Sequence, residues 1–362
     1  MPKPKWKVGI AGLRRGRGFA RVFDAHPRAQ VAAVCDVDHA RLAETAEAVK
    51  LPDDRLYTDF DEFLNAPIDI VVIATPIGGH AEQTIKSVES GRHVLCEQTA
   101  AYTIRDCERI VEAVRRTGMA YMMAENYSYF HYVREWKRLI ADGKLGDIFY
   151  AEGEYVHEIV ELLVDERTGA YTWRHDRAPI LYCAHCLGPL LTLMDDRVVK
   201  ACGSHAGFHR FPQQTEHLGF LDMEVGLFRT RKGALIKIVR SQVAPRHPTL
   251  VWYCLYGTKG QLESGRAGGD GLLYLQDEMS KQEGGRPMQC SSIDPAAPEE
   301  ARAGGHGTAE YYLIRDFLDA LDTGARPPID VMRSMDFTVP GIVAHESAMS
   351  DGNWRDVPLF DW

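Results

Sequence analysis

The feature that most constrains this chain is a glycine-rich turn directly after its first apolar strand. Residues 7–12 predict a short strand that ends at Gly12, and Gly16 follows within the next few residues. A second apolar strand, predicted over residues 30–35, ends at Asp36. A strand, a glycine-rich turn, a helix and a second strand that ends in an acidic residue form the layout of a dinucleotide-binding βαβ unit.

Each part of this unit has a physical role toward a nucleotide. Glycines let the backbone approach a pyrophosphate, and the free N–H groups of the following helix attract its charge. The carboxylate of Asp36 is placed to accept hydrogen bonds from the ribose hydroxyls and to repel a 2′-phosphate, so NAD is favoured over NADP. The spacing departs from G-x-G-x-x-G because Arg14 and Arg17 occupy two of the glycine positions. Arg14, Arg15 and Arg17 are candidate phosphate ligands. A tight turn without a ligand is the alternative interpretation.

Length and charge narrow the classes of function. A chain of 362 residues is long enough for two domains with full cores. The net charge of -9, with no basic block, argues against nucleic acid and against an anionic membrane as partners. The N-terminus shows no export signal and the chain has no long apolar run, so a cytoplasmic protein without a membrane span is expected.

The eight cysteines are scattered, which is typical of buried free thiols in a reducing compartment. Cys183 and Cys186 form the one C-x-x-C pair. Because a second ligand pair is missing, no metal site is predicted.

The order of the predicted elements indicates an α/β protein of two domains. Strands and helices alternate up to residue 126, which predicts a doubly wound parallel sheet of the Rossmann type over residues 1–125. Longer strands joined by turns then predict an α/β domain with a large, mostly antiparallel sheet over residues 126–362. Residues 264–307 are expected to form a long loop, and residues 309–321 a helix.

Polar residues follow three of the predicted parallel strands. Because ligands bind at the carboxyl ends of such strands, these residues are candidates for cofactor binding: Thr75, Pro76, Glu97, Gln98 and Asn126. Thr75 and Pro76 are suited to line the nicotinamide or its ribose, and Glu97 to bind ribose hydroxyls. Helix capping is the alternative role for each of them.

A second group of candidates lies in the C-terminal half. Tyr182 and His185 are three residues apart, so they share a face on a helical turn, and both side chains can transfer protons. Tyr155 and His157 share one face of a predicted strand and are expected to line the same cleft. Trp173 is either a stacking platform for a sugar or a core residue. A purely structural role is the alternative for His185.

These motifs resemble those of the glucose-fructose oxidoreductase / inositol dehydrogenase (Gfo/Idh/MocA) family. The resemblance covers nearly the whole chain and is carried by residues 9–12, 72–76 with His80, 91–94, 96–97 and 143–148. It implies a Rossmann domain followed by an open-sheet α/β domain that binds substrate and supports oligomers. It also adds His80 to the cofactor-binding candidates and implies a homo-oligomer, either a dimer or a tetramer.

Two positions depart from the pattern of the dehydrogenases in that family. Those enzymes carry Glu-Lys-Pro where this chain has Glu97-Gln98-Thr99, and an aspartate where it has Leu181. The departures resemble instead the branch that contains glycoside hydrolase family 109, the NAD-dependent α-N-acetylgalactosaminidases. The similar segments are residues 122–126, 151–157, 182–189, 305–307 and 344–347.

That branch implies a redox-neutral cycle with tightly held NAD, in which C3 of a sugar is oxidised, the C1 substituent is eliminated, water adds and the hydride returns. The resemblance implies Tyr182, His185 and His157 as catalytic residues, and Tyr155, Trp173, Arg174 and His306 as residues that bind a sugar or glycoside. A net sugar or cyclitol dehydrogenase, and a non-catalytic protein that binds NAD and a sugar, are the alternatives.

Overall fold

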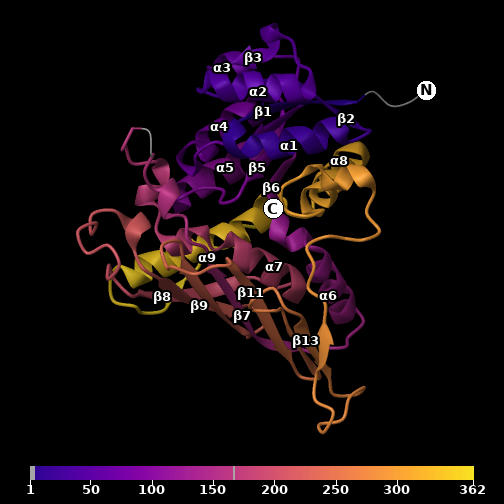
Figure 1. Cartoon of the computed structure of the whole chain (residues 1–362), viewed down its shortest axis with the longest axis vertical. Helices are drawn as coiled ribbons and strands as arrows, with labels where there is room; N and C mark the ends of the chain where they lie inside the picture. The colour runs from indigo at the N-terminus through magenta and orange to yellow at the C-terminus, as the bar shows by residue number, and fades with distance from the viewer. Residues whose placement is uncertain (1–4, 166–167) are drawn as a thin grey trace. The chain divides into compact units, whose positions relative to one another are not determined.

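The computed structural model describes residues 5–165 and 168–362 (Figure 1). Contacts divide the chain into two compact units. Unit 1 comprises Met1–Phe130, Ser292–Met335 and Phe360–Trp362, and unit 2 comprises His131–Ser291 and Asp336–Leu359. The division into functional domains after residue 125 stays a prediction. Among the described residues, no helix has the length and apolar character needed to span a membrane.

Unit 1 contains a six-stranded parallel sheet in the strand order β3-β2-β1-β4-β5-β6, which is the order of a Rossmann sheet and confirms the prediction. Its strands are β1 Trp6–Ala11, β2 Ala29–Cys35, β3 Leu56–Tyr57, β4 Ile70–Ile73, β5 His93–Glu97 and β6 Tyr121–Ala124. Strand β4, in the middle of the sheet, is buried along its whole length, because helices cover both faces of a parallel sheet.

The helices of unit 1 begin and end at residues with clear local reasons. They are α1 Leu13–Ala25, α2 His39–Val49, α3 Phe60–Phe63, α4 His80–Glu89, α5 Ile104–Thr117 and α8 Ala309–Thr323, and α9 Val331–Ala348 begins in this unit. In α5, the Thr103 side chain accepts a hydrogen bond from the Asp106 N–H at the first turn, and Gly118 ends the helix at a φ of 68°. The predicted helix over residues 309–321 is confirmed as α8.

Unit 2 contains a nine-stranded sheet in the order β14-β13-β12-β11-β7-β10-β9-β8-β15. Only the pair β10–β7 is parallel within it, so the predicted mostly antiparallel sheet is confirmed. Its strands are β7 Ile148–Val156, β8 Val198–His205, β9 Glu224–Thr230, β10 Leu235–Ser241, β11 Leu250–Gly257, β12 Gly260–Glu263, β13 Gly271–Leu275, β14 Arg286–Met288 and β15 Arg355–Asp356.

Glycines in this sheet let helices pack closely on one of its faces. A Cβ at Gly153 of β7 would lie 2.9 Å from the Cβ of Cys186 in α7 (Ala184–Met194), and one at Gly203 of β8 would collide with the carbonyl oxygen of Ala344 in α9. Figure 1 shows α7 and α9 on the same side of the strands. The remaining helix of the described part of unit 2 is α6, His131–Ala141.

The predicted long loop over residues 264–307 is wrong in part, because strands β13 and β14 lie within it and extend the sheet. Leu273 and Leu275 alternate along β13 and are 3% and 2% exposed. Strand β13 is short and lies between two glycine-rich segments. Its alternation of buried and less buried residues is therefore too brief to predict a strand from the sequence.

The buried His26 at the end of α1 is expected to make the free energy of unfolding fall at acid pH. His26 is 2% exposed, and its Nδ1 accepts a hydrogen bond from the Arg28 N–H at 3.3 Å, which requires an unprotonated nitrogen. Burial, and secondarily Arg28, lower the pKa of His26 from 6.5 to about 4. The unfolded chain therefore binds this proton more tightly, and stability that is complete above pH 6.5 falls as the pH drops toward 4.

We expect the melting temperature of His26→Asn to depend less on pH between 4 and 6.5 than that of the native protein. Asparagine keeps a hydrogen-bond acceptor but cannot be protonated. Thermal melts of both proteins across this range measure the difference. Parallel curves for the two proteins would contradict the assignment.

Candidate functional site

Two glycines shape the turn that leads from β1 into α1. Gly12 has a φ of 86°, and a Cβ on it would lie 2.5 Å from the backbone of Ala74 and Thr75 after β4. A Cβ at Gly16 would lie 2.8 Å from the Cγ2 of Ile10 in β1. Glycine is thus required at position 12 by the positive φ and by the closely approaching backbone of residues 74–75. It is required at position 16 because α1 packs closely on the sheet there.

Asp36 lies at the end of β2 with its carboxylate facing the start of α1. Its Oδ2 accepts a hydrogen bond from the Leu13 N–H at 2.6 Å, and its Oδ1 accepts one from the Asp38 N–H at 2.9 Å. Arg41 Nη1 is 3.7 Å from Oδ1. The acidic residue therefore already binds the glycine-rich turn, and this fixes its carboxylate beside the first free N–H groups of the helix.

Two of the predicted cofactor residues bind each other. Arg15 donates from Nε to Glu97 at 2.6 Å and from Nη2 to Glu310 at 3.0 Å. Glu310 is only 1% exposed, and although burial raises the pKa of its carboxyl, His306 and Arg15 lower that pKa to about 2. Glu310 is therefore an anion that ties α8 to the first helix of the unit.

His80 joins the two loops that follow β4 and β5. Its Nε2 lies 3.0 Å from the carbonyl oxygen of Thr75, and its Nδ1 lies 2.8 Å from that of Thr99. Burial lowers the pKa of His80, and the hydrogen bonds to the two carbonyl oxygens act in the opposite direction. The Thr75 hydroxyl also donates to Gln83 Oε1 at 2.5 Å.

The remaining predicted cofactor residues occupy the same edge of unit 1. Pro76 is exposed in the loop after β4, Gln98 is buried after β5, and Asn126 is buried directly after β6 and Glu125. Arg14 is exposed in the first turn of α1. All eleven predicted cofactor residues thus lie in unit 1, where the strands of a parallel sheet end.

His306 was predicted as a sugar ligand, and the structure places it in unit 1 beside two carboxyl groups. Its Nδ1 lies 2.6 Å from Glu310 Oε1, and its ring centroid is 6.1 Å from that of Tyr127. The nearby Glu125 is fully buried, and this raises the pKa of its carboxyl to about 8. Sequence reasoning missed Glu310, although its position four residues after His306 was a usable signal.

The predicted proton-transfer residues form one aromatic cluster in unit 2. Tyr182, in a 3-10 turn, and His185, in α7, have ring centroids 5.2 Å apart in an edge-to-face arrangement. The ring centroid of Tyr155 in β7 lies 5.3 Å from that of His185, and the Tyr155 hydroxyl is hydrogen-bonded to His157 Nδ1 at 2.8 Å. Burial, and then Arg240, lower the pKa of His157 to about 4, so this ring is neutral near pH 7.

Sequence reasoning missed two buried arginines beside this cluster. The guanidinium carbon of Arg177 lies 4.1 Å from the ring centroid of Tyr182, and that of Arg240 lies 4.3 Å from Tyr155 and 5.4 Å from Tyr182. They are 2% and 1% exposed, and within the described residues neither pairs with a carboxylate. Arg177 donates to Gln242 Oε1, and Arg240 to the carbonyl oxygens of Tyr155 and Ser241.

This arrangement is electrostatically unusual because isolated charges are costly to bury. Cation–π contacts and backbone carbonyls supply part of the compensation. Burial lowers the pKa of Arg240 to about 10, which still leaves the guanidinium charged near pH 7. The cluster therefore carries positive charge that favours an anion bound beside Tyr182 and Tyr155.

Two further contacts support the cluster from outside. Glu224 of β9 is fully buried, accepts the Ile180 N–H at 2.8 Å and lies 2.8 Å from His345 Nδ1 of α9. It thereby fixes the turn that carries Tyr182. The guanidinium carbon of Arg174 lies 4.3 Å from the ring centroid of Trp173, so these two predicted sugar ligands stack on each other. The guanidinium carbon of Arg177 lies 5.5 Å from the same centroid.

Comparison with known proteins identifies the fold of both units. Residues 6–125 match the model of the Gfo/Idh/MocA family, described as an oxidoreductase family with an NAD-binding Rossmann fold. The described chain superposes on levoglucosan dehydrogenase in complex with NADH and levoglucosan with a TM-score of 0.83 at 19% identity, covering 98% of this chain and 100% of that one.

Curated relatives extend the similarity over nearly the full length. A glycosyl hydrolase family 109 protein of Saccharopolyspora erythraea is 27% identical and covers 98% of this chain and 83% of its own. An alpha-N-acetylgalactosaminidase of Shewanella oneidensis is 26% identical, with 98% and 84% covered. Residues 6–125 are therefore similar to the NAD-binding Rossmann domain of the Gfo/Idh/MocA oxidoreductases, and nearly the whole chain is similar to glycosyl hydrolase family 109 proteins.

Proposed function

We propose that this protein oxidises a sugar at C3 with NAD and uses that oxidation to cleave a glycoside in a redox-neutral cycle. The observation that carries the proposal is the aromatic cluster of unit 2, where Tyr182 and Tyr155 lie beside two buried arginines that pair with no carboxylate among the described residues. Similarity to family 109 glycosyl hydrolases supports the same reaction class.

The residues of unit 1 fit NAD. The positive φ of Gly12 and the start of α1 present backbone N–H groups to a pyrophosphate, and the Asp36 carboxylate lies beside them for the ribose. NAD, when bound, supplies a hydride acceptor that is restored within each cycle. Thr75, Pro76, His80, Glu97, Gln98, Asn126, Arg14 and Arg15 are proposed to shape or contact the same site.

The residues of unit 2 fit the removal of a proton from carbon. A ketone at C3 acidifies the C2–H bond, so a phenolate or a neutral imidazole is a sufficient base. The positive charge of Arg177 and Arg240 stabilises the negative charge that develops on the sugar beside Tyr182 as the C2 proton leaves. We assign Tyr182 as the base, with His185 donating a proton to the leaving group, and the neutral pair Tyr155–His157 fixing the sugar oxygens.

Elimination then expels the C1 substituent, and water adds to the resulting double bond, so no pair of catalytic carboxylates is required. Trp173 and Arg174 are proposed to bind the sugar ring through stacking and hydrogen bonds. His306, which Glu310 holds, is also proposed as a residue that binds a sugar hydroxyl.

Solvent isotope incorporation tests this mechanism. We expect the enzyme with NAD to release phenol from a para-nitrophenyl glycoside in deuterium oxide and to leave deuterium at C2 of the sugar, because the C2 proton is exchanged during elimination. Tyr182→Phe should lower this rate by about 10²–10⁴-fold, while Tyr256→Phe, at an exposed tyrosine of β11, should leave it unchanged.

The alternative functions predict different results in the same assay. Phenol release without deuterium at C2 would exclude elimination. Stoichiometric accumulation of NADH would indicate a net dehydrogenase, and NAD binding without any turnover across the substrate panel would indicate a non-catalytic protein.

A cofactor titration tests unit 1 independently. Asp36→Ala removes both the ribose ligand and the acceptor that holds the Leu13 N–H, so we expect NAD affinity to fall by at least about tenfold, which is about 1.4 kcal/mol. The ratio of NAD to NADP affinity should also fall, because the carboxylate that repels a 2′-phosphate is gone.

Calorimetry with both nucleotides measures these changes, with Asp24→Ala as the control because Asp24 is exposed on the last turns of α1. An unchanged preference for NAD in Asp36→Ala would contradict the role assigned to this carboxylate.

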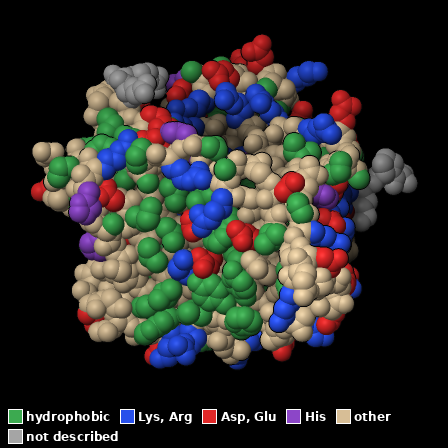
Figure 2. Space-filling view, turned by 60° about the horizontal axis from the view of Figure 1, so that its bottom comes forward, with side chains coloured by type: hydrophobic (Ala, Val, Ile, Leu, Met, Phe, Trp, Pro, Cys, Tyr) green, Lys and Arg blue, Asp and Glu red, His purple; other side chains and the backbone are tan. Residues whose placement is uncertain are grey.

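We also propose that the open face of the nine-stranded sheet binds a second copy of this chain, as a dimer or within a tetramer. Side chains of β9 and β10 that alternate away from α7 and α9 are half-buried and largely apolar: Val225, Leu227, Leu235 and Val239. Figure 2 shows hydrophobic side chains gathered on the face that the strands of unit 2 occupy at the bottom of Figure 1. An apolar patch of this kind marks an interface more often than a free surface.

Light scattering on the eluting protein tests this interface. We expect a mass of two or four chains, and a mass of one chain for the double variant Leu227→Lys/Val239→Glu, since buried charges oppose association. Val37→Lys, at a valine of unit 1 that is 84% exposed, is the matched control. A native mass of one chain would contradict the proposal.

All eight cysteines are free thiols, seven of them buried. This supports the proposal that the protein works in the reducing cytoplasm.

A further inference from the structure

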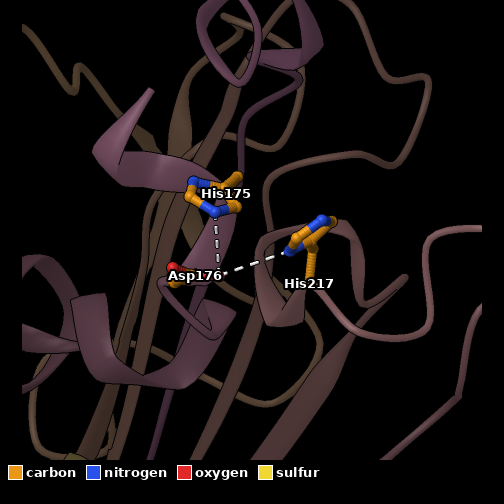
Figure 3. A group of neighbouring side chains, drawn as sticks. All are labelled: His175, Asp176 and His217. Carbon is orange, nitrogen blue, oxygen red and sulfur yellow. Dashed lines mark hydrogen bonds and ion pairs between the residues drawn. The ribbon is translucent and has the colours of Figure 1, made fainter. Parts of the chain in front are cut away.

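Three side chains of unit 2 outside the aromatic cluster converge on one point: His175, Asp176 and His217 (Figure 3). Asp176 Oδ1 lies 3.0 Å from His175 Nε2 and 3.4 Å from His217 Nδ1, and one ligand atom from each residue lies within 4.8 Å of the others. Separations of this size match those between ligands bound to one tetrahedral metal at ~2.0–2.2 Å. We propose that these residues bind one divalent transition-metal ion, for which Zn²⁺ is the probe.

The orientation of His175 supports metal binding. Its Nδ1 is hydrogen-bonded to the carbonyl oxygen of Thr172, so this nitrogen carries a proton and Nε2 faces Asp176, where it can bind a metal that replaces any proton on it. Metal-binding histidines are usually fixed in this manner, with the second ring nitrogen donating to a carbonyl or a carboxylate. Figure 3 shows the two imidazoles approaching the carboxylate from different segments of the chain.

The two segments that carry the ligands are held in place by packing. The ring of Tyr171 lies 4.9 Å from that of His175 and 4.5 Å from that of His217, and its hydroxyl donates to Gln214 at 2.9 Å. At Gly219 a Cβ would collide with the carbonyl oxygens of Arg174 and His175. The site is therefore supported before any metal binds, which lowers the cost of ordering its ligands.

The chemistry of the ligands selects the class of metal. Two imidazoles and one carboxylate suit Zn²⁺ and its transition-metal neighbours rather than Mg²⁺ or Ca²⁺, which prefer oxygen ligands only. The side chains of His175 and His217 are 19% and 24% exposed and that of Asp176 is 68% exposed, so an ion can enter from solvent and keep water at an open position.

The site lies next in sequence to the residues that contact the aromatic cluster. Arg177 follows Asp176 directly and stacks on Tyr182, and Trp173 stacks on Arg174 and Arg177. A metal here would fasten the segment of residues 171–177 to that of residues 214–220. We therefore assign it a positioning role for Arg177 and Trp173; binding itself does not depend on the proposed function.

Titration of the full-length protein, freed of any histidine tag and treated with EDTA, tests the proposal. We expect calorimetry with Zn²⁺ to show one strong site per chain, and thermal unfolding to shift upward with Zn²⁺, since a ligand of the folded state stabilises it. Co²⁺ should give visible d–d absorption without the near-ultraviolet sulfur-to-metal band, because no cysteine is among the ligands.

Variants separate this site from other metal-binding groups. His217→Ala and the isosteric Asp176→Asn should each weaken Zn²⁺ binding by at least about tenfold and abolish the thermal shift. His209→Ala, at an exposed histidine of the same connecting segment, should leave both unchanged.

The proposal is overturned if the native protein binds no Zn²⁺, if both ligand variants bind it as the native protein does, or if Co²⁺ shows a thiolate band. None of these readouts requires NAD or sugar turnover. A failure of the proposed glycosidase cycle therefore leaves this test intact, and the reverse also holds.

Discussion

The absence of a side chain at Gly12 is the constraint on which unit 1 depends. The backbone of Ala74 and Thr75 lies where a Cβ would be, so β4 and the β1–α1 turn approach each other closely only with glycine at this position. That approach fixes the start of α1 at the carboxyl end of the sheet, where Asp36 binds its first N–H group. The loops after β4 and β5 are then joined by His80, and α8 is joined to α1 through Arg15 and Glu310.

Unit 2 is organised around the burial of positive charge instead. Arg177 and Arg240 are placed against aromatic faces and carbonyl oxygens, and no described carboxylate neutralises them. Such an arrangement costs stability in the resting protein, because part of the desolvation penalty stays uncompensated. It becomes favourable when negative charge appears beside it, which is the situation that arises when a proton is removed from carbon next to a carbonyl group.

Local patterns made much of this fold predictable from the sequence. The strand, glycine-rich turn and acidic residue of the first βαβ unit are contiguous, and the period of α8 is carried by its own residues. The contact between Tyr182 and His185 was predictable because they are three residues apart, and that between Tyr155 and His157 because they are two residues apart in extended chain.

Long-range partners were not predictable in this way. Arg240 meets Tyr155 only because β10 pairs with β7, and Glu224 meets His345 only because α9 packs on β9. The same holds for His217, which reaches Asp176 from a distant segment. Strand β13 was missed because its period is short and lies between glycine-rich segments.

The contact between His80 and residue 99 determines which substitutions the loop after β5 can accept. His80 binds the main-chain oxygen of Thr99, and every amino acid offers that oxygen, proline included. The side chains at positions 98 and 99 can therefore change without loosening the link between the two loops, because that link is made to the main chain.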